Sequence, residues 1–556
     1  MKAIRVFSFV GMAALLAAGC SSPDSHSPSG SAVSAHVPLP RLGDHRFRVT
    51  TRSPQAQLAF DRGLTLAYSF GHYAAEQEFR RAAALDPELA MAWWGVALVN
   101  GPHVNFPFVP PNKAAVAWEA VQKAKSLAPG ASPLEQALID AVSRRYAQPQ
   151  PDDRSGLARA YADAMREVWK QNPRSADIAA LFAESVMDLH PWNYWQKDGQ
   201  PQSWTAEIVT PLETALQLNP RHPGANHYYI HAMEASPQAA KAVPAADRLG
   251  ALVPDSGHMV HMPSHIYARV GQWENAAESN RRAMQADQRY RAAYPRPGFY
   301  GLYMIHNAHF LSFVAMMQGD SSEALQCARQ AVAGIPQDFR EEFPGIVDGF
   351  LAIVPETLMR FGRWEEILAE PEPAAGMPLA RALWRYTRVA ALTSLDRLDD
   401  AKKEQADFEK QFAELPADSM MGNNHGSNLL KIASHVLKGE IAAKTGQYDE
   451  AIAQLRAAAV IEDTLVYDEP PGWIQPTRHT LGAVLLKAGK PAEAELVYQE
   501  ELHRNPENGW SLMGLRDSLK RQEKFAEAEK VGARWKKAWA SADVTPPSTC
   551  YCQRLE

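Results

Sequence analysis

One short pattern recurs along this 556-residue chain and limits what it can fold into: a glycine is followed five residues later by an alanine, between stretches with helical periodicity. The examples are Gly271 with Ala276, Gly319 with Ala324, Gly446 with Ala451, and Gly489 with Ala494. Glycine ends a helix because it adopts left-handed backbone conformations at little cost, and alanine lets two helices pack closely. The pattern therefore predicts consecutive helix-turn-helix units, and no alternating strand pattern competes with it.

Two stretches show the whole repeating unit. QLAFDRGLTLAYSFGHYAAEQEFRRAAALDP begins at Gln57, and RHTLGAVLLKAGKPAEAELVYQEELHRNP begins at Arg478. Their small and aromatic residues resemble the tetratricopeptide repeat, a helix-turn-helix unit of about 34 residues. The resemblance implies an all-α, right-handed superhelical solenoid of about ten helix pairs, which we place at residues 46–540. Insertions at residues 99–113 and 189–204 interrupt the repeats.

Three further stretches carry a narrower resemblance. They are NHYYIHAMEAS from Asn226, GHMVHMPSHIY from Gly257, and YDEPPGWIQPTRHTLGAVLL from Tyr467. These segments resemble a poorly characterised family of exported bacterial tetratricopeptide proteins. The resemblance implies a fold and an exported location, and it implies no particular activity.

The N-terminus, MKAIRVFSFVGMAALLAAGC, combines a basic start with an apolar run too short to cross a bilayer comfortably, which predicts a signal peptide at residues 1–20. Its end resembles a bacterial lipoprotein signal, although Ala17 stands where that pattern prefers leucine. The resemblance implies a lipid anchor on Cys20, and Ser21 implies an outer-membrane lipoprotein on the periplasmic face of the cell envelope. A soluble secreted protein cut nearby is the alternative. Residues 21–45 are rich in serine and proline and predict a disordered tether.

The other end of the chain, residues 541–556, is expected to be a C-terminal tail. It contains Cys550 and Cys552, which could bind a soft metal or form a disulfide. A frayed end is the interpretation that we favour from sequence, because chain termini are commonly poorly ordered.

Composition excludes several classes of function. The formal net charge is −6 and no stretch interleaves basic with aromatic residues, so we expect no nucleic-acid partner. The motifs HExxH, GxSxG, GxGxxG, GxxxxGK[ST] and CxxCH are absent. Their absence excludes several common enzyme classes in their standard forms, and it leaves a metal-dependent enzyme open.

Histidines concentrate where the repeat resemblance places the concave groove. In that family, groove side chains come from the second, fifth and ninth positions of a repeat. The turn glycines and the alanines that follow them place repeat starts at Gly257 and Ile305, and Pro254 suggests a further start at Pro223. The nine groove positions are then Gly224, His227, His231, His258, His261, His265, His306, His309 and Phe313. Seven of the nine are histidine, and we expect this wall to face solvent.

Neutral imidazole is the commonest protein ligand for late divalent ions, and histidines four residues apart share a helix face. We therefore predict that these seven histidines bind a transition metal: copper, zinc or iron. The alternative is an interaction scaffold whose groove takes a protein or peptide partner, with the histidines as a hydrogen-bonding wall. A further alternative is a metal-dependent enzyme, in which three protein ligands leave one coordination position open.

Other polar residues are candidates for the same groove. Ninth positions of other repeats hold Glu184, Glu356 and Glu440, and Glu234 and Asp188 lie near a groove edge. The loop 101–111 carries His103 and Asn105, and His425 precedes another first helix. A solvated or helix-pairing role is the ordinary interpretation of each residue taken alone.

Overall fold

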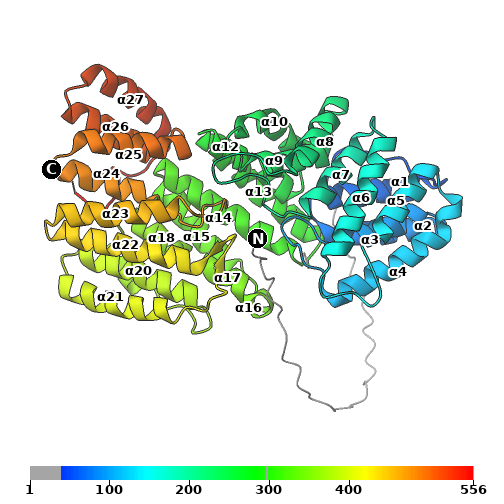
Figure 1. The fold of residues 1–556 in the computed structure, drawn as a ribbon, viewed down its shortest axis with the longest axis horizontal. Coiled ribbons are helices and arrows are strands. Elements are labelled where there is room, and N and C mark those ends of the chain that lie inside the picture. The colour runs from blue at the N-terminus through cyan, green and yellow to red at the C-terminus, as the bar shows by residue number, and fades with distance from the viewer. Residues whose placement is uncertain (1–38, 296–297, 555–556) are drawn as a thin grey trace, which may run out of the picture. The chain divides into compact units, whose positions relative to one another are not determined.

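The computed structural model describes residues 39–295 and 298–554, and these form an all-α solenoid of packed helix pairs (Figure 1). The predicted signal peptide at residues 1–20, the lipidation candidate Cys20 and residues 21–38 of the predicted tether lie outside the described residues. None of the helices in the described part of the chain combines the length and the apolar composition that crossing a bilayer requires.

The N-terminal helices precede the histidine-rich region. They are α1 (Pro54–Tyr68), α2 (His72–Leu85), α3 (Ala90–Val99), α4 (Pro111–Leu127), the 3-10 turn η1 (Ala128–Gly130), α5 (Pro133–Ser143), α6 (Ser155–Gln171), α7 (Ala176–Met187) and α8 (Thr205–Leu218). Residues 39–45 pack against both this region and the middle of the chain, although we assigned them to a tether. Leu42 is buried, the Arg41 guanidinium donates to Asp255, and His45 contacts Asp177. The tether prediction is therefore wrong for these seven residues.

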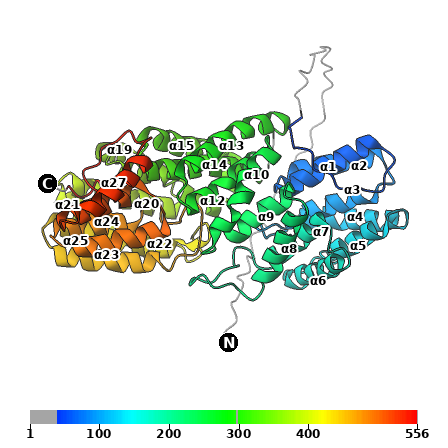
Figure 2. The same cartoon turned by 90° about the horizontal axis from the view of Figure 1, so that it is seen from above.

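The middle of the chain carries the histidines. Its helices are α9 (Pro223–Met233), the 3-10 turn η2 (Ala239–Ala242), α10 (Val243–Leu252), α11 (Gly257–His261), α12 (Pro263–Arg269), α13 (Trp273–Ala293), α14 (Tyr300–Gln318), α15 (Ser321–Ala333), α16 (Gln337–Glu342) and α17 (Pro344–Phe350). Helix α11 packs against α14. Helix α12 packs against α9 and α10 (Figure 2). Three consecutive first helices thus bring their histidines together.

The C-terminal part continues the pairing. Its elements are α18 (Ile353–Arg360), α19 (Trp364–Ala369), α20 (Pro378–Ser394), α21 (Leu398–Ala413), the two-residue strands β1 (Met420–Met421) and β2 (Asn424–His425), α22 (Gly426–Lys444), α23 (Tyr448–Glu462), α24 (Thr477–Lys487), α25 (Pro491–Arg504), α26 (Gly509–Arg521) and α27 (Phe525–Ala538). The strands β1 and β2 pair as an antiparallel hairpin.

The glycine pattern behaves as predicted. The turn glycines Gly271, Gly319, Gly446 and Gly489 all have positive φ, between 71° and 78°. Close helix packing also requires glycine: a Cβ on Gly482 or Gly514 would lie 2.3 or 2.2 Å from Cζ of Tyr498. The aromatic ring of α25 therefore fits between α24 and α26 only because neither helix has a side chain there.

The repeat register differs from the prediction in two places. Helix α14 begins at Tyr300, ahead of the repeat start that we placed at Ile305. The helix with the HMVHMPSH motif is divided at Met262 into α11 and α12, because Pro263 has no N–H to donate to the preceding turn.

Candidate metal centre

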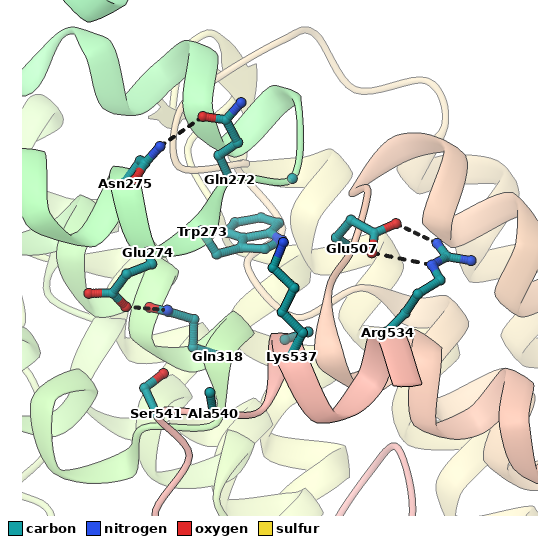
Figure 3. Close-up of a pocket in the computed structure, with 12 residues that line it drawn as sticks. Gln272, Trp273, Glu274, Asn275, Gln318, Glu507, Arg534, Lys537, Ala540 and Ser541 are labelled. Carbon is teal, nitrogen blue, oxygen red and sulfur yellow. Dashed lines mark hydrogen bonds and ion pairs between the residues drawn. The ribbon is translucent and has the colours of Figure 1, made fainter. Parts of the chain in front are cut away.

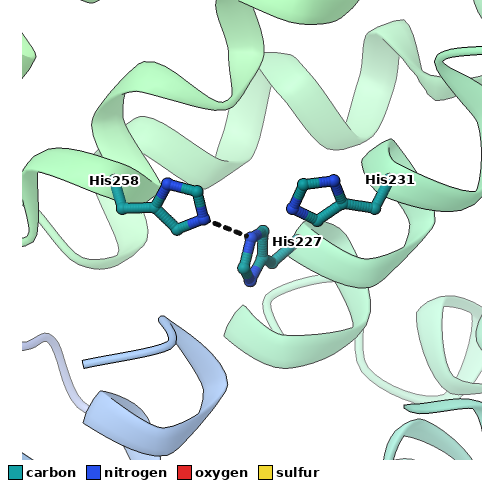
Figure 4. Close-up of side chains that lie close together, drawn as sticks. All are labelled: His227, His231 and His258. Carbon is teal, nitrogen blue, oxygen red and sulfur yellow. Dashed lines mark hydrogen bonds between the residues drawn. The ribbon is translucent and has the colours of Figure 1, made fainter. Parts of the chain in front are cut away.

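Six histidines form two adjacent groups, and in each the candidate ligand atoms lie within 4.8 Å of one another. Cluster A consists of His227 and His231 from α9 with His258 from α11 (Figure 4). Cluster B consists of His261 from α11, His265 from α12 and His306 from α14. The clusters are neighbours, since the ring centroids of His258 and His261 are 6.2 Å apart.

The clusters are buried, which corrects the expectation of a wall facing solvent. Each histidine of cluster A is at most 2% exposed, and His261 and His265 are 0% and 3% exposed. His306 is half-buried. Segments distant in sequence cover the groove, including the loop after α3, the loop after α7 with Trp192, and the loop before α24. The insertions that interrupt the repeats therefore close over the histidines.

Hydrogen bonds fix the tautomer of four of the six imidazoles. Nδ1 of His227 donates to the carbonyl of Tyr68 at 2.6 Å, and Nδ1 of His261 donates to Oδ1 of Asn280 at 2.6 Å. The Asn280 amide is oriented by its own donation to the carbonyl of Ala276 at 2.8 Å. Each acceptor has no proton to give, so the proton of each neutral imidazole resides on Nδ1.

Glu234 fixes the tautomers of the other two imidazoles, His231 and His265, and so bridges cluster A and cluster B. Its Oε1 accepts from Nδ1 of His231 at 2.7 Å, and its Oε2 accepts from Nδ1 of His265. Glu234 is fully buried just after α9, and its own carbonyl accepts from Nε of Arg269 at 3.0 Å. One carboxylate thus orients an imidazole of each cluster, as the outer carboxylates of metal-ligating histidines do.

In the four imidazoles whose tautomer is fixed, Nε2 carries a lone pair. Nε2 of His227 lies 3.1 Å from Nε2 of His258, and Nε2 of His261 lies 2.7 Å from Nε2 of His265. Nε2 of His231 is buried and has no hydrogen-bond partner among the described residues. Because Nδ1 carries the proton in His261 and His265, two acceptors meet at hydrogen-bond distance. That contact is repulsive unless a cation lies between or beside them.

Burial and mutual repulsion keep most of these imidazoles neutral. Burial, with the neighbouring histidines, lowers the pKa of His227, His258, His261 and His306 well below the usual value. For His265, burial also lowers the pKa, but the charge and hydrogen bond of Glu234 outweigh it, so the net pKa is raised.

The pKa values of two carboxyl groups beside the clusters, Glu234 and Glu469, are shifted in opposite directions. Burial favours a raised pKa for Glu234, yet His265 and His231 lower it to about 2. Burial raises the pKa of Glu469 to about 7. Neutral imidazole is the form that binds metal.

A cavity of about 410 Å³ lies against both clusters. Its wall includes His231, His258, His265 and His306. The remaining surface is mainly aromatic and aliphatic, with Asp468 and Glu469 at one side. The histidine nitrogens therefore adjoin a space large enough for a small ligand.

The other candidates from sequence belong to neither histidine cluster. His309 belongs to neither cluster; its ring is 5.1 Å from that of Phe350, and neither of its nitrogens has a hydrogen-bond partner in the described chain. His103 stacks on Phe70 at 4.6 Å, whereas Asn105 lines the cavity and donates to the hydroxyl of Tyr303 at 3.2 Å. Glu184 is buried beside Arg145 and Asp188, while Glu356 is buried, and His425 is exposed in β2. Glu440 is buried near the C-terminal cysteines.

A third cluster was missed from sequence because its members belong to three separate segments. Asp177 accepts from Nε2 of His45 at 2.9 Å, from Nε2 of His222 at 3.1 Å, and from the hydroxyl of Tyr68 at 2.9 Å. Nδ1 of His222 accepts the N–H of Ala225, which places its proton on Nε2. This cluster is a satisfied hydrogen-bond network and has no lone pairs directed at one another.

A larger cavity, of about 540 Å³, lies between the start of α13 and α27 (Figure 3). Its charged and polar side chains pair with one another: Arg534 bonds Glu507, and Gln318 donates to Glu274. No group of metal-binding side chains converges there among the described residues. We therefore place the candidate site at clusters A and B.

No protein-family model matches the chain, and no curated protein matches it. Solved structures match weakly. Human IFIT1 dimer with m7Gppp-AAAA is 14% identical over 88% of this chain and 92% of its own, with a TM-score of 0.34. Yeast Tom70 is 12% identical over 87% and 91%, with a TM-score of 0.29. The P58(IPK) TPR domain is 14% identical over 60% and 89%, with a TM-score of 0.19. Similarity at this level carries no argument about function.

Proposed function

We propose that the chain binds transition-metal ions at clusters A and B. The observation that carries the proposal is the 2.7 Å contact between Nε2 of His261 and Nε2 of His265, both with Nδ1 already bonded to an acceptor. A metal ion would convert two repelling lone pairs into two coordinate bonds. The hydrogen bonds at Nδ1 would then act as the outer contacts that orient histidine ligands.

A proton is the competing cation. An imidazolium at His265, stabilised by Glu234, would donate from Nε2 to His261 and would also remove the repulsion. A proton between His261 and His265 leaves the buried Nε2 of His231 in cluster A without a partner. A metal ion in each cluster would bind the lone pairs of His261 and His265 and also that of His231. We therefore favour metal over a proton.

The ligand set indicates the kind of metal. Three imidazoles in each cluster suit zinc or copper, and iron is the third candidate. Three protein ligands leave a coordination position open, and the 410 Å³ cavity adjoins both clusters. That adjacency is the observation that supports a metal-dependent enzyme as an extension of the proposal.

Elemental analysis of protein purified without a polyhistidine tag tests the proposal directly. We expect about two equivalents of one transition metal after reconstitution, one for each cluster. Less than about a tenth of an equivalent of any transition metal, before and after reconstitution, would refute it.

Matched variants assign the metal to the clusters. His261→Ala should remove about one equivalent, and His227→Ala the other, without loss of helical circular dichroism. His503→Ala is the control, because His503 is exposed on α25, away from both clusters. If His261→Ala keeps both metals but unfolds at a much lower temperature, His261 is a packing residue and cluster B is no metal site.

An interaction scaffold is the second candidate. It is supported by the C-terminal tail, because a segment of the chain itself packs against α24 and α25 through Thr549. Pull-down from envelope extracts should then recover a stoichiometric partner whose binding survives chelators. Partner binding that is lost on chelation would instead support a metal-binding function.

Export and lipidation are part of the proposal and rest on the sequence of residues 1–20. We expect the mature chain to be anchored through Cys20 to the outer membrane, on the periplasmic face of the cell envelope. Metabolic labelling with a fatty acid tests this: label that is retained in Cys20→Ser excludes the anchor.

A further inference from the structure

The C-terminal tail packs against the helices as an ordered part of the fold. Thr549 is buried, donates its hydroxyl proton to the carbonyl of His479 at 2.6 Å, and accepts from the hydroxyl of Tyr498 at 2.8 Å. Ser548 is buried as well, and its hydroxyl lies 2.6 Å from the carbonyl of Cys550. The expectation of a frayed end at residues 541–556 is therefore wrong for residues 548–553.

This packing places the two cysteines of the tail beside a carboxylate. The ligand atoms of Glu440, Cys550 and Cys552 lie within 4.8 Å of one another. Glu440 comes from α22 and is 4% exposed, and Cys550 is 2% exposed. The structure contains a disulfide between Cys550 and Cys552, and Sγ of Cys552 lies 3.9 Å from Oγ1 of Thr480.

Glu440 is the second, independent sign of a ligand. Its Oε2 is buried without a hydrogen-bond partner among residues 39–295 and 298–554. Burial, with no opposing charge, raises the pKa of Glu440 to about 8. A buried carboxyl is costly without a partner, so a nearby cation would stabilise it.

We propose that Cys550, Cys552 and Glu440 form a second, redox-dependent metal site, which binds a thiophilic divalent cation such as Zn²⁺ when the disulfide is reduced. Thiolate sulfur and carboxylate oxygen are both zinc ligands. The site lies outside clusters A and B and does not depend on the proposed function of the histidines.

The chemistry balances with a dithiol as reductant. The dithiol gives two electrons and two protons to the disulfide, which yields two cysteine thiols and an oxidised dithiol. Zn²⁺ then displaces the two thiol protons and the proton of Glu440, and two sulfur–metal bonds and one oxygen–metal bond form. Exchange with an oxidised dithiol reverses the reaction: its disulfide takes the two electrons and two protons to become a dithiol, the Cys550–Cys552 disulfide re-forms, and Zn²⁺ is released as Glu440 regains its proton.

Zinc uptake by the full-length protein, with and without prior reduction by a phosphine, tests the proposal. We expect the reduced protein to retain about one more equivalent of Zn²⁺ than the oxidised protein after gel filtration. With Co²⁺ as the probe, the reduced protein should also gain a thiolate-to-metal charge-transfer absorption. Equal zinc content in the two states, or no such absorption, would overturn the proposal.

Variants separate this site from the histidine clusters. The double variant Cys550→Ser and Cys552→Ser should lose the reduction-dependent equivalent, and Glu440→Gln should weaken it at least about tenfold. Glu356→Gln is the matched control. Burial raises the pKa of Glu356 to about 8, as it does for Glu440, but Glu356 does not belong to the group formed by Glu440, Cys550 and Cys552. Cys327→Ala controls for general thiol binding.

The histidine variants complete the design. His261→Ala should leave the reduction-dependent equivalent intact, so failure of one site is distinguishable from failure of the other. An equal loss in Glu440→Gln and Glu356→Gln, with helical content unchanged, would show that no specific site exists at Glu440.

Discussion

Nε2 of His261 lies 2.7 Å from Nε2 of His265, across the break that divides α11 from α12. Four residues apart, the two imidazoles share one helix face, and both are turned inward by acceptors at Nδ1. The arrangement concentrates lone pairs in a buried position, where they are costly unless a cation accepts them. This relationship distinguishes the histidines of cluster B from ordinary buried histidines with satisfied hydrogen bonds.

Glu234→Gln should weaken metal binding at both clusters. The glutamine amide offers one oxygen and one N–H₂ group, so one of the two Nδ1–H donors of His231 and His265 would face another donor. We expect affinity to fall by about 10- to 100-fold at one cluster and by less at the other. Competition titration against a chelator measures the metal affinities of both clusters.

The control for this prediction is Glu213→Gln. Glu213 also accepts a hydrogen bond from a residue of α9, the hydroxyl of Tyr229 at 3.0 Å, but it touches no clustered histidine. Equal affinities for wild type and Glu234→Gln would contradict an orienting role for Glu234.

Asn280 should control cluster B alone. Asn280→Asp keeps an acceptor for Nδ1 of His261 and should keep the metal, whereas Asn280→Leu removes the acceptor and frees the imidazole to change tautomer. We expect Asn280→Leu to lower the affinity of cluster B by about tenfold or more, with cluster A unchanged. If Asn280→Asp and Asn280→Leu behave alike, the hydrogen bond does not position the ligand.

Gly257→Ala should displace the start of α11. A Cβ at this position would lie 1.9 Å from Oδ1 of Asp287, a buried carboxyl held by a hydrogen bond from Asn307 at 2.7 Å. We expect a loss of about 1–3 kcal/mol in the free energy of unfolding and weaker metal binding, because α11 carries a ligand of each cluster. Gly156→Ala, which meets nothing within 4 Å, is the control. Thermal unfolding and metal content together check this.

The repeat architecture could be predicted from sequence because its signals are local. Turn glycines such as Gly319 and the alanines five residues later each act within one helix pair. The same register placed His258, His261 and His265 on one wall. Local signals define which residues share a helix face, and that was enough to find the histidines that cluster.

The burial of the clusters could not be predicted, because it depends on contacts between distant segments. The Nδ1 partners Tyr68 and Asn280 lie 159 and 19 residues from the histidines that they orient. His309 fits the register as well as His306 does, yet its ring packs near Phe350. Side-chain direction on a long helix is decided by its neighbours, which the repeat pattern does not specify.

Glu356 should make the stability of the chain depend on pH. Burial raises the pKa of this carboxyl from 4.5 to about 8, and Tyr386, which faces it from α20, stays neutral because burial raises its pKa too. The folded state therefore holds a proton that the unfolded chain releases above about pH 4.5. The resulting stability is present below that pH and is lost as the pH rises towards 8.

Glu356→Gln removes this titration and keeps the shape of the side chain. Each pKa unit corresponds to about 1.4 kcal/mol, so the variant should gain stability relative to wild type as the pH increases from 5 to 8.5. We expect its thermal midpoint to rise by about 2 °C or more relative to wild type over that range. Glu365→Gln, on the exposed side of α19, should show no such trend. A constant difference between Glu356→Gln and wild type across the range would mean that Glu356 ionises in the folded protein as readily as in the unfolded chain.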